Sequence, residues 1–270
     1  MKRMTRAFGR SIIGIFHPRM LWLSVRPFVI VAVIWGGILW FSWESFTEFL
    51  RLHISAISII EPVKRILEQI GQDDGMALVV PFLVAVIVVP LMIISLLLVI
   101  SVTTVSEVVQ YLSHQKIYSD LKKMHGGGFL GGAVLSLWTT LISLILMSLT
   151  FPIWWIPPLF IVIPPIIWGW LTMRLMSYDV LVQHASTEER ETLLKQFRWQ
   201  LLSMGIISGG LGAIPGLFWI SSSFMILLFP VVSLVMIWIY ALVFIFAALW
   251  FTHFLLQALK DMRQLKGDDS

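Results

Sequence analysis

The sequence contains no cysteine and few charged residues. Without cysteine, the chain of 270 residues can form no disulfide, no thiol nucleophile and no thiolate metal site. Only 13% of the residues are charged, whereas 58% are apolar. This composition leaves too little polar surface to cover a water-soluble globule. It predicts one integral membrane domain over residues 1–270.

Long apolar runs take the place of the missing charge. Six runs can each supply the ~20 helical residues that cross the hydrocarbon core of a bilayer. They cover residues 21–43, 76–105, 133–151, 153–173, 201–229 and 230–256. The sequence therefore predicts an all-α fold, a polytopic membrane helical bundle with about six membrane segments.

Basic residues are sorted along the chain. Of the 19 Lys and Arg residues, 16 lie at the two chain ends, at the opening of the first run or in the gaps that follow the second and fourth runs. Because basic residues accumulate in cytoplasmic loops, both termini are predicted to be cytoplasmic. We expect this charge to meet membrane lipids, since no basic and aromatic motif points to nucleic acid.

The segments between the runs have helical periodicity of their own. We expect a basic cytoplasmic helix at 1–20, amphipathic helices at the outer interface over 44–75, a cytoplasmic helix and Gly-rich hinge over 106–132, an amphipathic cytoplasmic helix over 174–200 and a cytoplasmic tail at 257–270. The helix before the hinge is expected to reach Met124. In the 174–200 segment, Ser186 and Glu189 have the spacing of a capping box, and Glu191 and Lys195 that of an i,i+4 ion pair.

Proline and glycine interrupt the fourth and fifth runs. Five prolines occur at positions 152, 157, 158, 164 and 165, so this run is either a broken crossing or two short half-penetrating helices. In the fifth run Gly205, Gly209 and Ala213 form a stripe of small residues, which favours close contact with a neighbouring helix. The alternative is a broken helix that exposes backbone amides to a solute.

Catalytic and metal-binding motifs are missing. There is no His-Glu-x-x-His and no Gly-x-Ser-x-Gly, and the six His residues have no i,i+3 or i,i+4 pair among them. We therefore expect neither an enzyme nor a metal site, and no cofactor.

Several short motifs resemble one known family. They are Phe8-Gly9-Arg10, His17-Pro18-Arg19, Arg26-Pro27, Ser177-Tyr178-Asp179 with His184, and the stretch from Gly205 to Pro215. They resemble the CysZ-type sulfate permeases of the etoposide-induced protein 2.4 superfamily. Two motifs depart from the family pattern: Arg19 follows Pro18 directly where the family has Gly-Leu-Arg, and Val180 follows Asp179 where the family has an aromatic residue and then proline.

The resemblance implies a bundle with half-penetrating hairpins, assembly into a homo-oligomer, and a place in the inner (cytoplasmic) membrane of a bacterium. It also implies transport of a small inorganic anion such as sulfate. A non-transporting membrane scaffold or assembly partner is the alternative, because packing stripes and amphipathic helices would be enough for that role.

A dianion needs fixed positive charge or oriented amides inside a membrane. The candidates are Arg19, Arg26 and Arg174, with the amides near Gly209 and Gly210; for each Arg, anchoring in the lipid headgroups is the alternative. Three further polar residues lie near the ends of apolar runs and are candidates for a coupling or structural role: Glu107, Asp179 and His184. Glu107 either couples a proton to transport or emerges into the cytoplasm.

Overall fold

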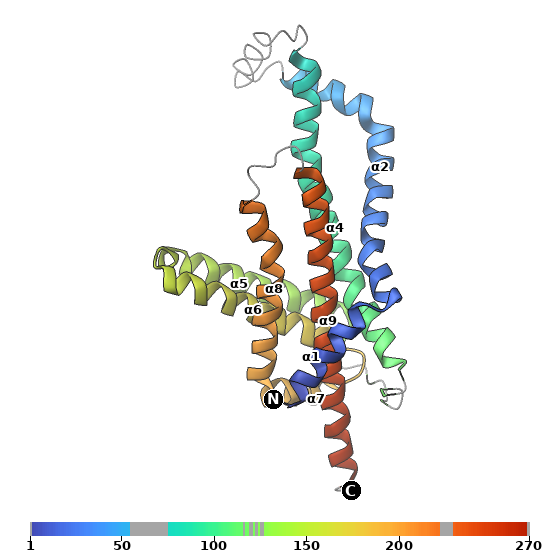
Figure 1. Ribbon diagram of the computed structural model, residues 1–270, viewed down its shortest axis with the longest axis vertical. Coiled ribbons are helices and arrows are strands. Elements are labelled where there is room, and N and C mark those ends of the chain that lie inside the picture. The colour runs from blue at the N-terminus through green and yellow to red at the C-terminus, as the bar shows by residue number, and fades with distance from the viewer. Residues whose placement is uncertain are drawn as a thin grey trace. The chain divides into compact units, whose positions relative to one another are not determined.

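The fold is all-α, as the sequence predicts, in a computed structural model that describes residues 2–54, 75–115, 117–118, 121, 124, 127–221 and 229–268 (Figure 1). In this part of the chain lie eight α-helices and one short 3-10 helix. They are α1 (Lys2–Ile15), α2 (Pro18–Ile54), α4 (Gly75–Ser113), α5 (Phe129–Thr150), η2 (Phe151–Trp155), α6 (Pro157–Leu181), α7 (Thr187–Gln196), α8 (Arg198–Ser221) and α9 (Phe229–Asp268).

Four stretches of helix among the described residues are long and apolar enough to cross a membrane: Pro18–Phe49, Ile87–Ser113, Leu130–Trp155 and Leu234–Leu265. They correspond to the first, second, third and sixth apolar runs. The fourth run lies mainly in α6, and the fifth run forms α8 as far as Ser221, with 222–228 outside the described residues. Of the amphipathic segment expected over 44–75, residues 44–54 continue α2 without a break, and 55–74 lie outside the described residues.

The described chain divides into two compact units, Met1–Ser24 with Val102–Ser270, and Val25–Ser101. In the Val25–Ser101 unit, Val84 and Val88 of α4 form a small buried cluster with Trp35 of α2. The Trp35 indole nitrogen donates to Ser95 Oγ over 3.3 Å, so its N–H is satisfied away from water. Trp35 is thus a packing residue, as its mid-run position predicts.

The other unit contains the larger core, and α1 is held against α9 within it. The Phe8 ring meets the rings of Phe246 and Trp250 edge to face, at centroid distances of 5.3 and 5.0 Å. The Trp250 indole nitrogen also donates to the Met4 carbonyl over 3.2 Å. These contacts place the buried stripe of α1 on α9 and leave Arg6 exposed to solvent.

Helices α5 and α6 form an antiparallel hairpin, with η2 at its tip (Figure 1). The hairpin runs across α8 and α9 rather than alongside them. After η2, the fourth run is therefore a single helix from Pro157 onward, and the alternative of two short half-penetrating helices within it is wrong. Pro157 and Pro158 lie in the first turn of α6, where a missing N–H costs nothing, and Pro164 and Pro165 are accommodated inside the helix.

Two helices approach each other closely where α6 crosses α8. A Cβ atom added to Gly205 would collide with the Gly169 carbonyl oxygen, and one added to Gly169 would collide with the backbone of Ile206. One turn further along α8, Gly209 faces the Trp168 ring, 3.0 Å from where its Cβ would be. Gly205 and Gly209 of the small-residue stripe therefore form a contact surface, which confirms the close-packing interpretation at these two positions.

The helix expected to reach Met124 ends earlier, because α4 stops at Ser113. After this end the chain turns so that Tyr118 is buried and its hydroxyl donates to the His253 carbonyl over 3.3 Å. Burial raises the pKa of Tyr118, so the phenol keeps the proton that it donates. A tertiary contact with α9 thus replaces further helix.

The glycine segment that follows packs around one aromatic side chain. Cβ atoms at Gly127, Gly131 and Gly132 would lie 2.7 to 3.0 Å from atoms of the Tyr178 ring or hydroxyl. The Tyr178 hydroxyl donates to the Gly128 carbonyl over 3.3 Å. The glycines therefore let the start of α5 approach α6 closely.

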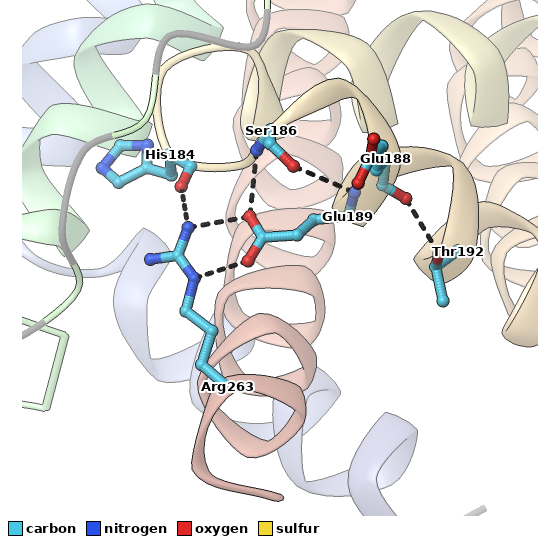
Figure 2. A network of polar contacts seen from close by, with 6 residues as sticks. All are labelled: His184, Ser186, Glu188, Glu189, Thr192 and Arg263. Carbon is cyan, nitrogen blue, oxygen red and sulfur yellow. Dashed lines mark hydrogen bonds and ion pairs between the residues drawn. The ribbon is translucent and has the colours of Figure 1, made fainter. Parts of the chain in front are cut away.

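A polar network fixes α7 to the C-terminal part of α9 (Figure 2). The predicted capping box is present: the Glu189 amide donates to Ser186 Oγ over 3.2 Å, and the Ser186 amide donates to Glu189 Oε2 over 2.9 Å. Arg263 donates through Nε and Nη2 to the two oxygens of Glu189, each over 2.9 Å, and through Nη2 to the His184 carbonyl over 2.7 Å. The two charged side chains are only 20% and 12% exposed, so this bidentate pair is shielded from water.

Gly205→Ala should destabilise the protein, because the added methyl must push α8 away from the Gly169 carbonyl. Overpacking of this kind costs about 1–3 kcal/mol. We expect a melting temperature several degrees lower in neutral detergent. Gly210→Ala is the matched control, since nothing lies within 4 Å of its Cβ position. Equal melting temperatures for the two variants would contradict the close crossing.

Arg263→Ala should also lower the melting temperature, because it leaves the shielded Glu189 carboxylate without its bidentate donor. Hydrogen bonds to charged groups contribute about 1.5–3 kcal/mol each. Lys195→Ala removes the base of the exposed Glu191 pair, which has an N–O distance of 3.7 Å and side chains 81% and 61% exposed. That control should cost at most about 0.5 kcal/mol. A double-mutant cycle with Glu189→Gln that gave no coupling would refute the role of the pair.

Candidate functional site

An open pocket with a volume of about 540 Å³ lies between α6, α7 and α8. Four of its lining residues are charged: Arg174, Glu191, Lys195 and Arg198. The other five are Trp170, Met173, Leu194, Trp199 and Leu202. The lining therefore combines three basic groups and one carboxylate with two indoles and three aliphatic side chains. We call it the basic pocket.

The crossing of α6 and α8 positions two walls of the basic pocket. Trp170 to Arg174 directly follow Gly169 on α6, and Arg198 to Leu202 precede Gly205 on α8. Because α6 and α8 meet so closely at the glycines, their flanking turns share one pocket. The third wall is α7, which its capping box and the Arg263 pair hold in place.

Each Arg of the basic pocket lies against a tryptophan. The Arg174 guanidinium is 5.8 Å from the centre of the Trp170 ring, and that of Arg198 is 5.0 Å from the centre of the Trp199 ring. These are cation–π distances, and they limit the directions in which each guanidinium can point. Glu191, the one acid among the lining residues, pairs with Lys195 at 3.7 Å. The pocket is therefore electropositive and suited to an anion.

Arg19 lies elsewhere, at the start of α2. Its guanidinium is 5.5 Å from the centre of the Tyr111 ring, and the His17 ring is 5.3 Å from the same ring. The amides of Met20 and Leu21 donate to the His17 carbonyl over 2.8 and 3.1 Å. The first amides of α2 are thus occupied, so an anion at this place would meet the Arg19 side chain rather than the backbone.

The other candidate residues are not gathered at either place. Arg26 is exposed on the part of α2 that belongs to the Val25–Ser101 unit. Gly209 packs on Trp168, and Gly210 has open space beside it. Because α8 continues without a break through both glycines, their amides belong to the helix.

The three remaining polar candidates differ in their surroundings. Glu107 is half-buried on α4, within the candidate span Ile87–Ser113. Asp179 has exposed surface area, yet apolar crowding around its carboxyl raises its pKa to about 6. His184 is buried in the turn after α6, where its carbonyl accepts from Arg263. Since α6 continues to Leu181, Arg174 and Asp179 lie on different faces of the same helix.

The structure also identifies residues that were not among the sequence candidates. Lys195 and Arg198 share the basic pocket with Arg174. Arg190 lies over the Tyr178 ring, with its guanidinium 4.8 Å from the ring centre. The sequence could have indicated Arg198 as a residue of this pocket, because Trp199 follows it directly and such a pair is typical of the headgroup level of a membrane.

Comparison with known proteins identifies the family. The family described as "Sulfate transporter CysZ/Etoposide-induced protein 2.4" matches residues 7–223, which include α2 and α4 to α8 in full and α1 from Ala7 onward. No curated protein and no solved structure matches the chain. This match confirms the resemblance drawn from the short motifs, and the name of the family includes a transporter. The chain belongs to the sulfate transporter CysZ/etoposide-induced protein 2.4 family.

Proposed function

We propose that this protein carries a small inorganic anion of the sulfate type across the inner (cytoplasmic) membrane of a bacterium. The family match over residues 7–223 carries the proposal. The candidate membrane spans in α2, α4 and α9 support it, because a transporter needs several spanning helices. The many cationic residues near the ends of these spans are also expected in a protein that attracts an anion.

Arg19 is the residue that we assign to contact with the anion. It belongs to the His17-Pro18-Arg19 motif, close to the place where the family has Gly-Leu-Arg, and it is exposed at the start of a candidate span. The Tyr111 ring beside it restricts the guanidinium. A guanidinium can donate two parallel hydrogen bonds to a tetrahedral oxyanion, which replaces part of the water that the ion loses.

The helix arrangement supports a finer membrane topology. The α5–α6 hairpin runs across α9, which itself contains the candidate span Leu234–Leu265 (Figure 1). If α9 crosses the membrane, a hairpin inclined to it reaches only part of the depth and returns to the same face. We therefore propose that α5 and α6 form a half-penetrating hairpin, with both chain termini and α7 on the cytoplasmic side.

We propose that the protein forms a homo-oligomer, because α5 has apolar surface that the chain leaves exposed. The candidate span Leu130–Trp155 comprises α5 and η2, and only 11% of the residues in its apolar window are buried within the chain. Its apolar side chains need either lipid or a second protein surface. The non-transporting scaffold is the competing function, and it would use the same surface to bind a partner.

Sulfate uptake into proteoliposomes tests transport. With purified protein and a sulfate gradient, we expect uptake above that of empty vesicles, and Arg19→Ala should reduce it about tenfold because a charge-assisted contact is lost. Arg6→Ala removes an equally exposed base from α1 and should leave uptake unchanged. Wild-type protein that moves no sulfate, and that co-purifies with a stoichiometric partner, would establish the scaffold instead.

The absence of native cysteine allows a direct test of the hairpin. Trp155→Cys at its tip should react with a membrane-impermeant maleimide from neither side, since a half-penetrating tip stays within the hydrocarbon. Gln196→Cys, exposed at the end of α7, should react from the cytoplasmic side only. Labelling of position 155 from the outer side would mean that α5 crosses the membrane completely.

A further inference from the structure

We propose that the basic pocket binds the phosphate group of an anionic phospholipid, with an acyl chain lying along α6. This site is separate from the proposed contact of the transported anion with Arg19. It goes beyond transport, and it would hold for the scaffold as well.

The charge of the basic pocket suits a phosphodiester. The lining contains three bases and one carboxylate, and that carboxylate, Glu191, forms an ion pair with Lys195. Arg174 and Arg198 are thus the groups that remain to meet an added negative charge. Bases near the membrane surface contribute to the binding of anionic lipids in this way.

The apolar part of the lining distinguishes a lipid from a free inorganic ion. Five of the nine lining side chains are indoles or aliphatic groups. A free sulfate or phosphate ion would fill a small fraction of about 540 Å³ and would gain nothing from these five side chains. A phospholipid has both the phosphate and the hydrocarbon that such a lining binds.

The two indoles also place the basic pocket at the depth of the headgroups. Trp199 is 68% exposed, with Arg198 stacked over its ring, and Trp170 is stacked in the same way with Arg174. Indoles concentrate at the interface between hydrocarbon and water, where one end of the ring meets headgroups and the other meets acyl chains.

A stripe of α6 leads from the basic pocket into the apolar part of the hairpin. Ile166, Trp170 and Arg174 are four residues apart, so they lie on one face of the helix. Ile166 is 43% exposed. A phosphate held at Arg174 would therefore leave its acyl chain beside Trp170 and Ile166, where it could cover the exposed part of the Ile166 side chain.

Native mass spectrometry of the full-length protein in neutral detergent tests the proposal. The probes are dioleoylphosphatidylglycerol, dioleoylphosphatidylcholine and inorganic phosphate. We expect a bound phosphatidylglycerol that phosphatidylcholine does not replace and that inorganic phosphate in large excess does not displace. Displacement by inorganic phosphate would identify a free-anion site and overturn the lipid assignment.

Variants locate the site. Arg174→Ala with Arg198→Ala should weaken phosphatidylglycerol binding about 30-fold, since each base near an anionic lipid contributes roughly fivefold. Lys2→Ala with Arg6→Ala removes two exposed bases from α1 and is the matched control, expected to bind like the wild type. Equal binding by both double variants would show that the lipid responds to overall charge, and the proposal would fall.

Two further measurements separate a lost site from a damaged fold. The pocket variant should keep the wild-type melting temperature in lipid-free neutral detergent and lose only the rise in melting temperature that phosphatidylglycerol produces. Arg174→Lys with Arg198→Lys keeps the charge without the planar group, so its affinity should be intermediate. Because neither measurement uses sulfate flux, failure here and failure of transport are distinguishable.

Discussion

The contact between Gly169 and Gly205 is the constraint on which the larger unit depends. Apolar side chains gain little by leaving lipid for another helix, so close backbone contact has to hold membrane helices together. With no side chain at either position, α6 and α8 approach until the backbone of one meets the backbone of the other. The turn that follows Gly169 on α6 and the turn that precedes Gly205 on α8 then form two walls of the basic pocket.

Polar interactions hold α7 in place beside the crossing of α6 and α8. The shielded Arg263 and Glu189 pair ties α7 to α9, and the capping box of Ser186 fixes where α7 starts. These two interactions fix α7, which is the third wall of the basic pocket. The two Arg side chains of the basic pocket, Arg174 and Arg198, lie against the indoles of Trp170 and Trp199. Positive charge and apolar surface thus occur together at a boundary where phospholipids present both of their counterparts.

Local patterns predicted the parts of this protein that depend on neighbours in sequence. The capping box, the i,i+4 pair of Glu191 and Lys195 and the stripe at Gly205 and Gly209 each involve residues within one or two turns of each other, and each apolar run is continuous in sequence. The early end of α4 could not be predicted, because burial of Tyr118 on α9 joins residues 135 positions apart. The unbroken α6 was equally hidden, since its prolines alone suggested two short helices.

By itself the sequence determined the all-α class, the membrane setting and the family, because hydropathy, the distribution of charge and short motifs can be read without knowing any tertiary contact. It also named Arg174 as a possible anion ligand. Only the tertiary structure decided that Arg174 shares a pocket with Lys195 and Arg198, while Arg19 lies beside Tyr111. The reason is physical: a pocket is made by helices distant in sequence, and which faces they share is settled by how closely two glycines allow them to cross.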